Sequence, residues 1–180
     1  MVFYYFETNY DYNPRIEIQN STRQKNISKK IAKVITINLI VWYNNVMKEL
    51  MKRIADHLGL DPIPIKYEKI SDDSRMYFEK GYMAISCKLK DNYEECAKCI
   101  AHEMMHLFQI WYAKLMNDER AMRWKEEFQN GINSSNMNSA EEYLCQELEL
   151  DAFAFTKYYL ETYEGIEVVH RVPMYEKLIE

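Results

Sequence analysis

The chain has 180 residues and a mass of 21.7 kDa, the size of one ordinary domain that can bury a core of its own. Its formal charge is −5 and its pI is near 5.5, which excludes the basic surface that replaces counterions on nucleic acid. A hydrophobic fraction of 48% and a total of only 4 Gly and 4 Pro exclude a largely disordered chain and favour long regular elements.

No apolar run approaches the ~20 residues that cross a bilayer, since the longest candidate, residues 35–43, is interrupted by Thr36 and Asn38. Residues 1–7 lack the basic segment and the small-residue cleavage site of a secretory signal. We therefore expect a cytoplasmic protein without a membrane or nucleic-acid partner. In that compartment its 4 cysteines are expected to be thiols.

The N-terminal region, residues 1–27, is predicted to form an arm with strand character, because residues 15–19 alternate as a half-buried strand does. From Ser28 apolar residues recur every three or four positions, which predicts one long amphipathic helix ending at Gly59. A β-branched run in its first half leaves a break near Ile40 open.

A small sheet is predicted next, followed by a helix. The three expected strands are separated by turn residues and span residues 65–70, 76–78 and 82–87. Asp91 and Glu94 form a capping box, after which helix formers run to Met116 without Gly or Pro.

The last third of the chain predicts two more helices around a polar loop. One covers residues 119–129, and the other opens at a capping box of Ser139 with Glu142 and ends at Gly165. No repeat or linker interrupts the sequence, so we expect a single domain over residues 1–180, with a C-terminal tail over residues 166–180.

The sequence His102-Glu103-Met104-Met105-His106 lies in the middle of the predicted helix at residues 91–116. Residues four apart on a helix lie one turn above each other, so the two histidines can bind one metal ion, with Glu103 beside it. This is the HExxH pattern of zinc peptidases. It arises by chance in roughly one chain in a hundred of this composition, so a second feature is needed.

That second feature is a later helix bearing carboxylates. A catalytic zinc takes three protein ligands and keeps a position for water, and two His with one Glu is a known set. Glu147 is expected to complete it, with Asp151 four residues on along the same face. Glu149 is the competitor for third ligand, and Cys145 is a further alternative if the helical register differs. Cys96 and Cys99 form a CxxC on the HExxH helix and are expected to be buried thiols rather than ligands.

HExxH followed by ExxxD resembles the gluzincins, the zincin metallopeptidases whose third ligand is glutamate. The segment from Glu147 to Ala154 also resembles the ExEA[ND]xFA segment of the ImmA/IrrE-like metallopeptidases. The resemblance implies a zincin-like α+β fold with a long N-terminal helix, a small mixed β-sheet, the HExxH helix and a C-terminal helix carrying the third ligand. It also implies that residues 82–87 are the sheet edge that pairs with substrate, and that Asp151 accepts the free ring N–H of His102.

The function predicted from these residues is a soluble zinc endopeptidase, with one Zn²⁺ per chain, acting on an intracellular protein or peptide. Glu103 would be the general base that activates a zinc-bound water. His170 and Tyr158 are candidates for the donor that stabilises the transition state. The alternative is a zinc-binding domain of the same fold that serves as a protein-interaction module. The sequence leaves the oligomeric state open.

Overall fold

The computed structural model describes residues 14–130 and 146–169, and for residues 14–27 and 35–42 it describes the backbone alone. The Ser139–Glu142 capping box, Cys145 and His170 lie outside the described residues. By its internal contacts the chain divides into two units, Met1–Asn45 and Val46–Glu180. The second unit contains the sheet and every predicted site residue that the structure describes.

The first element is a 45-residue helix, α1 (Pro14–Leu58). The strand expected at residues 15–19 is wrong, because these residues lie in its first turns. Pro14 suits the first helical position, and extending an existing helix gains a hydrogen bond for each residue fixed, which outweighs five residues of alternation. The helix is continuous past Ile40, and Gly59 follows it with φ +68°, a left-handed conformation that favours glycine.

Among the described residues the sheet has three strands, β1 (Ile65–Glu68), β2 (Ser74–Tyr77) and β3 (Tyr82–Ser86), in the order β1-β3-β2. β1 pairs with β3 in parallel and β2 pairs with it antiparallel, which confirms a mixed sheet. β3 is therefore the central strand, and the expectation that residues 82–87 form the sheet edge is wrong. The apolar run Met83-Ala84-Ile85 is fully buried, as in a strand covered on both faces.

The HExxH helix is α2 (Tyr93–Leu115). Its N-cap is Asn92, whose side-chain oxygen accepts a hydrogen bond from the Glu95 amide at 3.2 Å, one residue later than predicted. Asp91 and Asn92 are both good capping residues, so the sequence alone did not separate them. The next helix is α3 (Glu119–Asn130).

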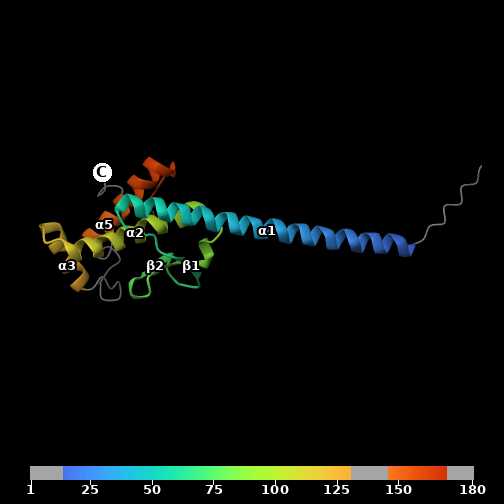
Figure 1. Cartoon of the computed structure of the whole chain (residues 1–180), viewed down its shortest axis with the longest axis horizontal. Coiled ribbons are helices and arrows are strands. Elements are labelled where there is room, and N and C mark those ends of the chain that lie inside the picture. Colours follow the sequence, from blue (N-terminus) through green and yellow to red (C-terminus); the bar gives the residue numbers. More distant parts are fainter. Residues whose placement is uncertain (1–13, 131–145, 170–180) are drawn as a thin grey trace, which may run out of the picture. The chain divides into compact units, whose positions relative to one another are not determined.

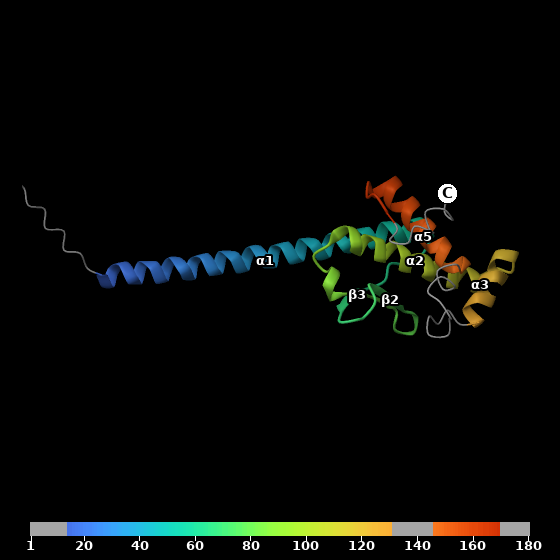
Figure 2. The same cartoon turned by 180° about the vertical axis from the view of Figure 1, so that it is seen from behind.

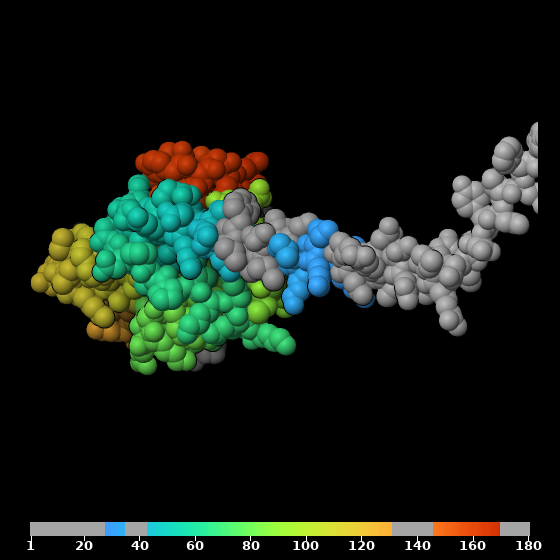
Figure 3. Space-filling model, turned by 45° about the vertical axis from the view of Figure 1, so that its right-hand side comes forward, coloured from blue at the N-terminus to red at the C-terminus, as the bar shows by residue number. Residues whose placement is uncertain are grey.

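The last helix that the structure describes is α5 (Glu147–Tyr159), which continues as a π-helical turn, η3 (Leu160–Glu164). It ends at Gly165, as predicted, and the φ of this glycine is +67°. α5 lies against α2 in both cartoon views (Figures 1 and 2). Arg53 of α1 donates two hydrogen bonds to the Glu164 carboxylate, at 2.9 and 2.7 Å. Within the unit Val46–Glu180, this part of α1 lies between the sheet and η3 on the face seen in Figure 3.

The described residues therefore have an α+β fold with a three-stranded mixed sheet, which confirms the predicted class. The core of the second unit joins α1 residues such as Leu50 and Ile54 to Ile100 and Met104 of α2 and to Leu160 of η3, all of them fully buried. Over the described ranges, no helix combines the length and the apolar character needed to cross a membrane.

Candidate metal centre

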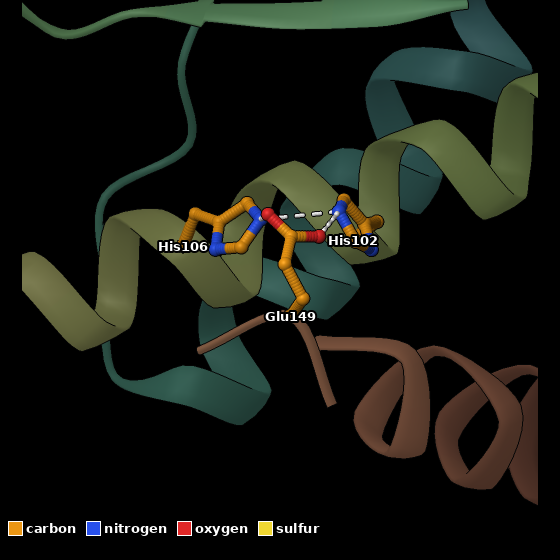
Figure 4. Close-up of side chains that lie close together, drawn as sticks. All are labelled: His102, His106 and Glu149. Atoms are coloured by element: carbon orange, nitrogen blue, oxygen red, sulfur yellow. Dashed lines mark hydrogen bonds and ion pairs between the residues drawn. The ribbon is translucent and has the colours of Figure 1, made fainter. Parts of the chain in front are cut away.

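The two histidines of HExxH lie on the face of α2 that meets α5. Their ring centroids are 4.6 Å apart, and the Nε2 atoms of His102 and His106 are 3.0 Å apart. The side chains are 17% and 13% exposed, so solvent still reaches them. Figure 4 shows both rings directed at the same point beside α5.

Glu149 of α5 completes this group (Figure 4). One carboxylate oxygen lies 3.3 Å from His102 Nε2 and the other lies 3.4 Å from His106 Nε2, and the side chain is only 2% exposed. Glu147, the expected third ligand, instead accepts two hydrogen bonds from the Arg123 guanidinium, at 2.8 and 3.1 Å. The structure therefore brings Glu149, the competitor, to the histidines.

The spacing of these atoms suits a tetrahedral metal ion. Ligand bonds of about 2.0–2.2 Å at tetrahedral angles place neighbouring ligand atoms about 3.4 Å apart. His102 Nε2 lies 3.0 Å from His106 Nε2 and 3.3 Å from one Glu149 oxygen, and the other Glu149 oxygen lies 3.4 Å from His106 Nε2, so each pair of residues offers atoms at about this spacing. The group is also the donor set, two imidazoles and one carboxylate, that catalytic zinc uses.

Gln109 is bonded to His106 and is itself fully buried on α2. Its Oε1 lies 2.8 Å from His106 Nδ1, and its Nε2 donates to the Leu148 carbonyl at 2.9 Å. An imidazole that donates from Nδ1 keeps its lone pair on Nε2 when neutral. His106 is thereby prepared to bind a metal through the nitrogen that faces Glu149.

In the absence of a metal the charges of this group support one another. Burial favours the neutral form of Glu149, but hydrogen bonds from His102 and His106 and their positive charge outweigh it and lower the pKa of the carboxyl. Burial also opposes charging of His106, but the hydrogen bond and charge of Glu149, together with the charge of Glu103, raise its pKa. A divalent cation would replace the protons in this pair.

Glu103 follows His102 on α2 and is 8% exposed. Its Oε1 accepts a hydrogen bond from the Ser74 hydroxyl of β2 at 2.8 Å, so the sheet fixes the position of this carboxylate. Its negative charge contributes to the raised pKa of His106, one of the candidate ligands. Glu103 is therefore oriented by β2 and lies beside the candidate ligands.

Asp151 does not bond to His102 as expected; its carboxylate accepts from Arg120 at 3.0 Å. His102 Nδ1 is buried and has no hydrogen-bond partner among the described residues, and the ring lies against Phe153, with centroids 4.6 Å apart. The hydroxyl of Tyr158, the described candidate donor, lies 3.3 Å from that of Tyr163, and the side chain is 53% exposed.

Cys96 and Cys99 are buried thiols, as expected. Cys96 donates to the Leu89 carbonyl at 3.2 Å, and burial raises the pKa of Cys99 to about 12. Neither is part of the metal-binding group found in the described residues.

From the sequence, Gln109 and Ser74 were not identified as site residues, and Glu147 was preferred to Glu149 as the third ligand. Gln109 lies one turn after His106, and a polar residue there on a buried helix face was a usable signal. Glu149 shares its helix face with Ala152 and Thr156, which are buried, whereas Glu147 and Asp151 are on a more exposed side. Ser74 carried no signal in sequence, because its role depends on strand packing.

Comparison of the chain with protein-family models, with curated proteins and with solved structures finds no match.

Proposed function

We propose that the protein is a zinc-dependent endopeptidase of the gluzincin kind, acting on a protein or peptide in the cytoplasm. The observation that carries the proposal is the convergence of His102, His106 and Glu149 beside Glu103. The ligand set proposed here is thus His102, His106 and Glu149.

Zinc bound to these three residues would lower the pKa of a bound water from 15.7 toward ~7 and polarise a peptide carbonyl. Glu103 accepts the proton of the attacking water and passes it to the leaving nitrogen, as general base and then general acid. The Ser74 hydroxyl holds one oxygen of Glu103, which leaves the other free for the proton. Gln109 orients His106, and burial of Glu149 keeps its carboxylate beside the histidines.

The sheet offers an edge to an extended substrate beside this site. β2 pairs with β3 on one side, and no strand pairs with its other side among the described residues. Because Ser74 of β2 contacts Glu103, a peptide that adds to the free edge of β2 would run past the catalytic carboxylate.

A Glu103→Gln variant tests the proposal, with Glu94→Gln as the matched control on the exposed side of the same helix. Both variants are expected to bind one zinc per chain. Cleavage of a diverse peptide pool, read by mass spectrometry, should fall by at least 100-fold in Glu103→Gln and stay at the wild-type rate in Glu94→Gln. Equal cleavage by Glu103→Gln and wild type would refute the assigned role.

The alternative, a zinc-binding domain that serves as a protein-interaction module, is favoured by one observation: Glu103 is buried and already hydrogen-bonded. A zinc-loaded wild type that cleaves nothing in the peptide pool, and whose stability improves in Glu103→Gln, would support this second function.

A further inference from the structure

The Gln109 side chain joins the two halves of the candidate metal centre. It lies on α2, one turn after His106, and is 0% exposed. Its amide contacts His106 Nδ1 on one side and the Leu148 carbonyl on the other. Leu148 is the residue immediately before Glu149, so one side chain contacts a histidine ligand and the backbone that carries the carboxylate ligand.

The orientation of this amide follows from its partners. The Leu148 carbonyl can only accept, so the amide must present its NH₂ group there and its oxygen to His106. That oxygen can also only accept, so His106 must donate from Nδ1. The neutral ring is then confined to the tautomer whose Nε2 lone pair faces Glu149.

The backbone of Leu148 is held from two sides. While Gln109 binds its carbonyl, the Glu127 carboxylate of α3 accepts from its amide at 2.9 Å and from the Glu147 amide at 3.0 Å. The N-cap residue Gln146 makes no capping bond of its own, so Glu127 replaces it. The first turn of α5, which carries Glu149, is therefore fixed by α2 and α3 together.

We propose that Gln109 is the positioning residue of the metal centre: it selects the metal-binding tautomer of His106 and sets the distance between His106 and Glu149. The inference deepens the proposed function and rests on it for the identity of the metal. Gln109 touches no reacting atom and acts only through the two ligands it orients. His102, whose Nδ1 has no partner among the described residues, lacks such a device.

The test combines zinc affinity with the histidine tautomer in the metal-free protein. Gln109→Met keeps the length and removes both hydrogen bonds, whereas Gln109→Glu keeps an acceptor for His106 and loses the donor to Leu148. Thr156→Val is the matched control, because Thr156 is buried, 3% exposed, and its hydroxyl donates a hydrogen bond to the Ala152 carbonyl within α5. Zinc affinity is measured by competition with a chelating indicator. Tautomers are read from ¹⁵N chemical shifts at a pH high enough that the His106 signals no longer change with pH and the ring is neutral.

In the wild type we expect the Nδ1–H tautomer at His106. Gln109→Met should lose this preference and bind zinc about 10- to 100-fold more weakly, the range for residues that orient metal ligands. Gln109→Glu should keep the tautomer and lose less affinity, and Thr156→Val should bind zinc as the wild type does.

An Nε2–H tautomer at His106 in the wild type, or equal zinc affinity in wild type and Gln109→Met, would overturn the inference while leaving the proposed function in place. A wild type that binds no zinc would instead refute the proposed function. The tautomer of the metal-free protein, and its change in Gln109→Met, would then decide alone whether Gln109 orients His106.

Discussion

Replacing Glu149 with Gln tests the assignment of the third ligand most directly. The substitution keeps the volume of a side chain that is 2% exposed, and replaces a carboxylate that faces both histidines by a neutral amide. Glu147→Gln is the matched control: the same change two residues earlier, on a carboxylate that pairs with Arg123. The two variants have the same composition and differ only in which face of α5 loses its charge.

The expected size of the effect follows from the geometry. Residues that merely orient ligands cost 10- to 100-fold in metal affinity, so loss of a direct ligand should cost at least 100-fold. At a zinc concentration 1,000 times the wild-type Kd, zinc stabilises the wild type by about 4.1 kcal/mol, and a 100-fold weaker site by about 1.4 kcal/mol. The missing ~2.7 kcal/mol corresponds to roughly 5–11 °C in Tm for a chain of this length.

The assay is the zinc-induced change in Tm together with the zinc content of protein purified without added metal. Each variant is compared with its own chelator-treated form, which removes any effect on the metal-free fold. Wild type and Glu147→Gln should carry about one zinc per chain, and Glu149→Gln should carry little and lose most of the shift. Zinc loss in Glu147→Gln with retention in Glu149→Gln would refute the reasoning and restore Glu147 as the ligand.

Two further predictions concern the support of the site and its pH dependence. Glu127→Ala removes the acceptor for the first amides of α5. It should lower the free energy of unfolding, measured by urea denaturation, by about 1–2 kcal/mol. An unchanged midpoint of urea unfolding would show that these amides have other partners. In the metal-free protein Glu149, with its lowered pKa, stabilises above its ordinary value of 4.5, and His106, with its raised pKa, stabilises below its ordinary value of 6.5. Their contribution to stability should therefore be greatest between pH 4.5 and 6.5 and should decline as pH rises through the folded pKa of His106. The gain in Tm on adding zinc should grow over that same rise in pH, because the metal displaces the proton of His106. Parallel curves of Tm against pH with and without zinc would contradict this prediction.

The sequence predicted elements well where periodicity and capping agreed. α2 was expected from Asp91 to Met116 and covers Tyr93–Leu115, and the end at Gly165 was found because a left-handed residue there favours glycine. The alternation at residues 15–19 failed because five residues cannot outweigh helix propagation. The order of the strands could not be read from sequence, since pairing depends on contacts between segments far apart.

At the site, local spacing was sufficient for the histidines and insufficient for the carboxylate. His102 and His106 lie on one helix, so their relation is fixed by the helical repeat. Glu147 and Glu149 are both on α5, and choosing between them requires the rotation of α5 about its axis against α2. That rotation depends on which face of α5 is buried, and the buried residues Leu148, Ala152 and Thr156 set it so that Glu149 points inward.

The same rotation explains what the ExxxD spacing does in this chain. Glu147 and Asp151 do share a helix face, as predicted, but that face meets α3, where Arg123 and Arg120 lie three residues apart and each binds one of the two carboxylates. With Glu127 at the first amides of α5, three charged side chains of α3 hold the helix that carries Glu149. A motif that resembles a ligand pair thus fixes the orientation of the helix, and the carboxylate between its two members is the one that reaches the histidines.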